Sequence, residues 1–146
     1  MANQLKQAAD EIAGACLASR TRLLGRVITS IYDDALRNVG LTASQMTILV
    51  ALEHTGGIHP AAICEALKLD KSTLSRNVDR MERNGWVEKA AGEDARSHTL
   101  RLSDTGRKKL GEAVPYWRTA QATAEEVLGK GGMDTMVRIS KRIRGF

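Results

Sequence analysis

The chain has 146 residues, of which 42% are hydrophobic and only 3% aromatic, a composition sufficient for one packed, mainly helical domain. Its formal net charge of +5 favours a polyanionic partner, either nucleic acid or an acidic membrane surface. The two cysteines, Cys16 and Cys64, are too few for a secreted disulfide framework and lack the paired spacing of a zinc site, so we expect a cytoplasmic protein.

The N-terminal region, residues 5–39, carries apolar residues at helical spacing and predicts one long helix that ends at Gly40. Two glycines inside it, Gly14 and Gly25, indicate a bend or a later start, because glycine disfavours a helix. Asp10 and Glu11 interrupt the apolar segment that a signal peptide would need, and no stretch approaches transmembrane length. We therefore expect no membrane partner.

Two short helices should follow. Thr42 and Gln45 have the spacing of a capping box, which predicts a helix start at this point, and Gly56 ends that helix. Pro60 suits the first turn of the next helix, because its missing N–H would be unpaired there in any case. The residues between that helix and Asp70 then form a tight turn.

The fourth predicted helix, residues 71–84, begins after a capping Asp70 and carries Leu74, Val78 and Met81 on one apolar stripe that should face the core. Its opposite face is rich in hydroxyl groups and arginines, namely Ser72, Arg76, Asp79 and Arg83, flanked by Thr73, Ser75 and Arg80. Hydroxyls near a helix N-terminus can bind phosphates, and arginine can contact guanine edges in a major groove. The alternative is an ordinary solvated face of an amphipathic helix.

A small β-hairpin is predicted immediately afterwards. Residues 86–89 and 99–102 are short alternating or β-branched segments, and the polar link between them contains Asp94 and Arg96. This order favours the DNA-binding interpretation, because a winged helix places the fourth helix in the major groove and an arginine of its hairpin in the adjacent minor groove.

Two helices complete the chain. Ser103 can cap a long helix that extends through Leu128 with a kink expected at Pro115, and a last helix is expected over about residues 133–143. The predicted fold class is therefore mainly α with a small β-hairpin wing (α+β).

Residues 69–76 and 84–87 resemble the recognition helix and first wing strand of the MarR family, and Asp94-Ala95-Arg96 followed by Leu100 resembles its wing motif. The resemblance implies a winged helix-turn-helix with a helical dimerisation region. On that basis residues 1–40 and 104–146 form the dimerisation region, and residues 41–103 form the DNA-binding domain. It also implies a palindromic operator with half-sites about one helical turn apart.

The expected function is that of a sequence-specific double-stranded DNA-binding regulator, a homodimeric repressor controlled by a small molecule or an oxidant. Arg76 is the main candidate for base readout, Lys71 and Arg83 for phosphate contact, and Arg96 for the minor groove. The full set of candidate DNA contacts is Lys71, Ser72, Thr73, Ser75, Arg76, Asn77, Arg80, Arg83, Asp94 and Arg96.

The control site has four candidates. Some proteins of the MarR type sense oxidants through a cysteine near the start of the first helix, which would be Cys16, but a small packed side chain at a dimer seam is the favoured interpretation. Tyr32, Tyr116 and Trp117 are candidates to line a pocket for a small aromatic effector, although core packing is the favoured role for aromatic residues at helical spacing. Cys64 is expected to be a packing residue.

No catalytic constellation is found among the three histidines and two cysteines. His59 and Cys64 are five residues apart, which is the wrong spacing for adjacent metal ligands on a helix, and the glycines at 129–132 follow no predicted strand. We therefore expect no enzymatic activity, no metal and no cofactor. The remaining alternative is a helical adaptor whose basic face binds a protein or an acidic membrane, and it gives no reason for a basic hairpin.

Overall fold

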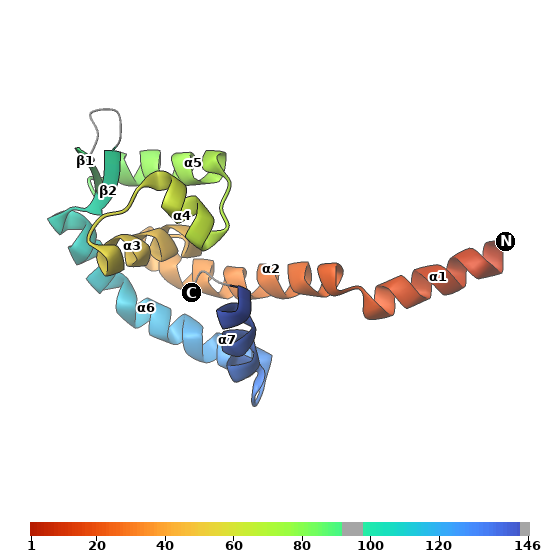
Figure 1. The fold of residues 1–146 in the computed structure, drawn as a ribbon. Helices are drawn as coiled ribbons and strands as arrows, with labels where there is room; N and C mark the ends of the chain where they lie inside the picture. Colours follow the sequence, from red (N-terminus) through yellow and green to blue (C-terminus); the bar gives the residue numbers. More distant parts are fainter. Residues whose placement is uncertain (92–97, 144–146) are drawn as a thin grey trace.

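The computed structural model describes residues 1–91 and 98–143. Its elements, in chain order, are α1 (Ala2–Ala15), α2 (Leu17–Leu36), the short 3-10 helix η1 (Arg37–Val39), α3 (Ala43–Thr55), α4 (Pro60–Leu67), α5 (Lys71–Arg83), β1 (Val87–Ala91), β2 (His98–Leu102), α6 (Asp104–Leu128) and α7 (Gly132–Ile143). Figure 1 shows α3, α4, α5 and the hairpin gathered into one lobe, while α1 projects away from it. The predicted mainly helical fold with a two-stranded wing is confirmed.

The prediction of one long N-terminal helix was wrong. The backbone at Cys16 is extended, with ψ 108°, and it separates α1 from α2. Gly14 lowers the helix propensity of the last turn of α1, and the Arg20 guanidinium donates a hydrogen bond to the Gly14 carbonyl near the break. All described side chains of α1 are exposed, so no tertiary packing keeps the two segments in one straight helix.

The predicted helix starts are confirmed by their capping hydrogen bonds. The Thr42 side chain accepts from the Gln45 N–H, and the Gln45 side chain accepts from the Thr42 N–H, which completes the capping box. Asp70 caps α5 and Ser103 caps α6 in the same way, each accepting from the backbone N–H three residues ahead. These caps set the direction in which each helix leaves its turn.

The hairpin is antiparallel and pairs Val87 with Leu102 and Lys89 with Leu100. Its first strand begins one residue later and ends two residues later than predicted, because the Trp86 N–H donates to the Met81 carbonyl and belongs to the turn after α5. Ile58 exchanges backbone hydrogen bonds of 3.0 and 2.9 Å with Leu100, which attaches the wing to the segment before α4.

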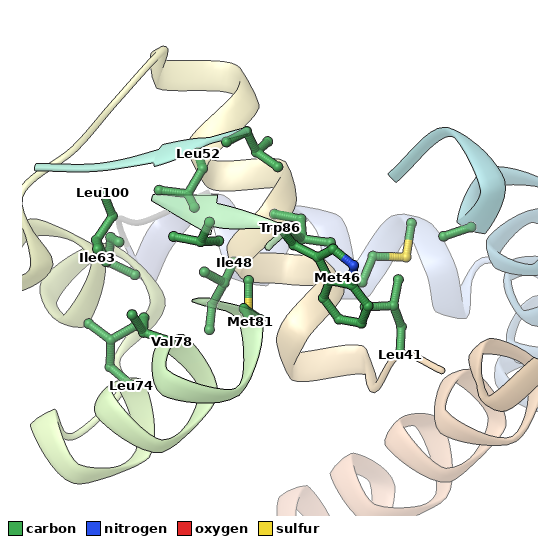
Figure 2. Packing of buried hydrophobic residues seen from close by; sticks show 14 of the residues in the cluster. Leu41, Met46, Ile48, Leu52, Ile63, Leu74, Val78, Met81, Trp86 and Leu100 are labelled. Carbon is green, nitrogen blue, oxygen red and sulfur yellow. The ribbon is translucent and has the colours of Figure 1, made fainter. Parts of the chain in front are cut away.

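A single apolar core fixes α5 against the rest of the lobe. Leu74, Val78 and Met81 are buried, as the sequence pattern predicts, and they pack with the buried Ile63 of α4 and Leu100 of β2 (Figure 2). Because one stripe of α5 is held in this core, its opposite face must point to solvent.

Helix α6 continues on both sides of Pro115, as one element of 25 residues. Near its start, Gly106 lies so close to the preceding turn that a Cβ placed on it would be 2.0 Å from the Trp86 carbonyl oxygen. Helix α6 packs along α2, and these two helices lie below the lobe of α3, α4, α5 and the hairpin in Figure 1.

Candidate nucleic-acid interface

The outer face of α5 gathers most of the predicted DNA-contact residues. Lys71, Ser72, Ser75, Arg76, Arg80 and Arg83 are all exposed, whereas the apolar stripe of the same helix is buried. The face is therefore polar and cationic along the whole helix, with Asp79 as its acidic member. Helix α5 lies at the upper edge of the lobe in Figure 1, beside the hairpin.

The start of this face is organised by Asp70. Its carboxylate accepts a backbone hydrogen bond of 2.8 Å from Thr73, a 2.6 Å hydrogen bond from the Ser72 hydroxyl and a 2.7 Å hydrogen bond from the Thr73 hydroxyl. These contacts, the Ser72 hydroxyl first, hold the pKa of Asp70 well below its usual range. Asp70 is therefore ionised at neutral pH. The sequence pattern predicted its capping role but missed its contacts with the two hydroxyls.

Arg76 lies one turn further along the helix. Its Nη2 donates a 3.3 Å hydrogen bond to the Thr73 hydroxyl oxygen. Arg76 is exposed, and a guanidinium has five N–H donors in all, so donors remain for bidentate contact with a guanine edge. Arg83 differs, because its Nε donates to the Asp79 carbonyl of its own helix at 3.2 Å.

Asn77 does not lie on the exposed face with the other candidates. Its side chain is half-buried and donates hydrogen bonds to the Ser44 hydroxyl of α3 at 3.4 Å and to the Thr73 carbonyl at 3.0 Å. Asn77 therefore links α5 to α3. The sequence placed it among the polar residues of α5, and only the position of α3 shows which way its amide is turned.

The two predicted wing residues, Asp94 and Arg96, lie outside the described residues. The strands that lead into this link are in place, with Ala91 paired to His98. On β1, Lys89 forms a 3.0 Å ion pair with Glu82 of α5, which connects the wing to the end of the same helix.

A pocket of about 430 Å³ lies between α4, α5 and the hairpin and was not predicted from the sequence. It is lined by α4, α5 and both strands, including His59, Cys64, Lys89 and His98. The rings of His59 and His98 are 6.3 Å apart between centroids. These residues are far apart along the chain, so no local pattern could have brought them together.

Two of the three aromatic effector candidates share a second pocket. Tyr32 and Trp117 line a volume of about 330 Å³ between α2, α3 and α6, and Tyr116 is not among its lining residues. The Tyr32 hydroxyl forms a hydrogen bond with the Gln121 side chain. Burial, and to a smaller extent the charge of Glu125, raises the pKa of Tyr32.

The two cysteines occupy different surroundings. Cys16 is half-buried at the junction of α1 and α2, where the hydroxyl and then the backbone N–H of Ser19 lower the pKa of its thiol. Cys64 packs against the buried core of the lobe, which confirms its expected packing role.

Within residues 1–91 and 98–143 no three His, Cys, Asp or Glu side chains are arranged to hold a metal ion. None of the described helices has the length and apolar content needed to cross a membrane.

Comparison with known proteins identifies transcriptional regulators as relatives of this chain. The profile of the MarR family matches residues 39–97. The transcriptional regulator PecS of Dickeya dadantii is 35% identical over 100 residues, which cover 66% of this chain and 58% of PecS. The uncharacterised regulator YwoH of Bacillus subtilis is 32% identical over 87 residues, 60% of this chain and 64% of YwoH. The matched segments thus span less than two thirds of either regulator.

A solved structure extends the similarity to the whole fold. The transcriptional regulator MOSR of Mycobacterium tuberculosis, solved in complex with DNA, superposes with a TM-score of 0.75 at 30% sequence identity. The match covers 88% of this chain and 96% of the MOSR chain. A match over this share of the chain extends beyond the lobe that contains α5.

Proposed function

The chain belongs to the MarR family of transcriptional regulators, which are not enzymes. From this premise we propose that it is a repressor of transcription that binds double-stranded DNA at a specific sequence. The observation that carries the proposal is the outer face of α5. One side of that helix is held in the core, and the other presents Arg76 and Arg80 with exposed hydroxyls and cations around them. A helix with this distribution fits a DNA major groove.

Each part of the face has a proposed role. Arg76, supported by the Thr73 hydroxyl, contacts base edges, while Ser75 and Arg80 lie beside it in the same groove. Lys71 and Arg83, at the two ends of α5, contact phosphates. Arg96 of the wing enters the adjacent minor groove, where the negative potential attracts an arginine.

The acting form is a homodimer on a palindromic operator. In one chain, apolar side chains of the terminal helices stay exposed, among them Leu5 and Ile12 of α1 and Ile139 of α7. Isolated amphipathic helices of this length are marginally stable in water, so a second copy is the natural partner for these faces. Residues 1–40 and 104–146 would then form the dimerisation region, and residues 41–103 would form the DNA-binding domain.

Control by a small aromatic effector or by an oxidant is the last part of the proposal. The pocket beside Tyr32 and Trp117 touches both the terminal helices and α3 of the lobe, and Cys16 lies at the junction of α1 and α2. A ligand at either place acts only through its different affinity for DNA-competent and DNA-incompetent dimers. The proposed site of action is the cytoplasm.

Selection of bound sequences from a random duplex pool tests this function. The wild-type protein is expected to enrich a palindrome, and Arg76→Ala is expected to lose about 1–3 kcal/mol of binding and to relax specificity at one base pair in each half-site. Lys71→Ala should weaken all sequences alike. Arg96→Ala should weaken binding through the loss of its minor-groove contact.

Arg118→Ala is the matched control. Arg118 is exposed on α6, outside the DNA-binding lobe, so its loss removes the same charge without removing a proposed DNA contact. Because α6 belongs to the proposed dimerisation region, sedimentation equilibrium must first show that this variant dimerises like the wild type. Failure of the folded dimeric protein to enrich any sequence would contradict the proposal and support the helical adaptor instead.

A further inference from the structure

At the start of α5, one carboxylate holds both neighbouring hydroxyl groups. We infer that Asp70 is a specificity-determining positioning residue, because it makes Ser72 a hydrogen-bond acceptor toward DNA and Thr73 an acceptor toward Arg76. This inference rests on the proposed DNA binding through α5. It goes further by assigning the class of base that the beginning of the helix selects.

Both hydroxyl groups at the start of α5 donate their protons to Asp70. An ionised carboxylate only accepts hydrogen bonds, and each hydroxyl has one proton to donate. The Ser72 proton is directed to Asp70 Oδ1 at 2.6 Å, and the Thr73 proton to Oδ2 at 2.7 Å. Charge-assisted hydrogen bonds of this kind are stronger than neutral ones. The oxygen lone pairs that remain can only accept.

Groups on DNA differ in whether they donate or accept. Phosphate oxygens, guanine O6 and N7 and thymine O4 are all acceptors, so none of them pairs with a hydroxyl whose proton is already engaged. The amino groups of adenine and cytosine donate in the major groove. Ser72 is exposed and is therefore matched to an adenine or cytosine amino group.

The negative charge of Asp70 disfavours phosphate binding at the start of α5. Phosphates often bind at helix N-termini, and hydroxyls near the start of a helix suggest this use from sequence alone. Here the Thr73 N–H is already donated to Asp70, and the carboxylate charge repels a second anion beside it. We therefore expect the hydroxyl groups at the start of α5 to contact bases, and the side chains of Lys71 and Arg83 to contact phosphates.

Thr73 connects Asp70 to Arg76, the main candidate for base contact. Its half-buried hydroxyl oxygen accepts from Arg76 Nη2 at 3.3 Å while its own proton is donated to Asp70. Asp70 thereby orients Thr73, and Thr73 orients the Arg76 guanidinium. The two-step connection limits how Arg76 approaches a base edge.

Asp70→Asn tests the inference because it keeps the shape of the side chain and remains a good helix cap. The amide has one oxygen for the three donors and adds N–H donors of its own, so at least one hydroxyl must turn its proton outward. The measurement is the affinity of full-length wild type and variant for every single-base variant of the wild-type-selected operator. Asp79→Asn on the same helix is the control, since it removes one negative charge without touching either hydroxyl.

Both carboxylate variants should bind all sequences more tightly, because each adds the same net charge. Only Asp70→Asn should change the base preference, by about three- to tenfold. The change falls at the base pair that Ser72 contacts if the Ser72 proton turns outward, and at the base pair that Arg76 contacts if the Thr73 proton does. Ser72→Ala should lose the preference at the base pair that Ser72 contacts. Thr73→Val lacks the hydroxyl that orients Arg76, so it should lose preference at the base pair that Arg76 contacts.

A profile of Asp70→Asn that equals the profile of Asp79→Asn would overturn the inference. Uniform weakening of binding to all sequences would overturn it too, because that pattern is the signature of a cap with a purely structural role. Failure of the proposed function is recognised separately, since the wild-type protein would then show no base preference before any variant is compared.

Discussion

The DNA-binding lobe and the terminal helices differ in how their apolar faces are covered. In the lobe, Leu49 and Ile63 are fully buried, whereas Leu5 of α1 is 74% exposed and Ile143 of α7 is 63% exposed. Both regions contain amphipathic helices, so the difference does not come from local pattern. The lobe completes its core within one chain, and the terminal helices present faces that only another surface can cover.

The largest expected effect is a cavity in the core of the lobe. Leu49→Ala should lower the free energy of unfolding by about 2–5 kcal/mol, because the methyl groups removed leave a space that the packed lobe cannot fill. Ile139→Ala in α7, where the side chain is already exposed, should stay within about 0.5 kcal/mol in the monomer. Urea denaturation below the dimer dissociation constant measures both. Equal losses would remove the contrast between the two regions.

Two glycines of α6 sharpen the same comparison. Gly106→Ala should destabilise the protein by about 3 kcal/mol, because its Cβ would meet the Trp86 carbonyl, which cannot yield without moving the turn before the wing. Gly111 has no atom within 4 Å of an added Cβ, so Gly111→Ala should stabilise α6 by up to about 1 kcal/mol. Thermal unfolding followed by circular dichroism gives the two signs. A neutral Gly106→Ala would show that the helix-to-turn contact is looser than described.

A smaller effect is expected from the exposed apolar side chains Leu5 and Ile12, the apolar stripe of α1, whose removal should weaken dimerisation and so matter more at low protein concentration. Leu5→Gln combined with Ile12→Gln keeps helix-forming residues but removes the apolar face, so it should weaken dimerisation by about tenfold. Sedimentation equilibrium measures the dissociation constant. Lys6→Gln, a substitution outside this stripe, should leave dimerisation unchanged. If the stripe variant dimerises like the wild type, α1 has no part in the interface.

The smallest expected effect is the pH dependence from Asp70. Its lowered pKa in the folded state means that its contribution to stability is present at pH values above about 4, the unfolded pKa of aspartate, and is lost as the pH falls below this value. The difference in melting temperature between wild type and Asp70→Asn should therefore be largest near pH 7 and shrink below pH 4. A constant difference down to pH 3 would contradict the ionised carboxylate.

Sequence signals from near neighbours predicted the helices of the lobe better than they predicted α1 and its junction with α2. Thr42, Asp70 and Ser103 cap their helices as expected, because a cap involves only residues within one turn. The break at Cys16 was not predicted as such: Gly14, two residues before it, indicated a bend or a later start, but apolar periodicity continues across the break. Periodicity describes which residues would share a face, and it does not say whether any tertiary contact holds the helix straight.

The sequence by itself determined the order of the elements, the buried stripe of α5 and the cationic face opposite to it. Those features depend on helical geometry and on hydrogen bonds between near neighbours. Only the tertiary structure decided that Asn77 turns to Ser44, 33 residues away, and that His59 and His98 line one pocket. Such contacts follow from where whole elements pack and from side-chain rotamers, and neither is specified by spacing along one helix.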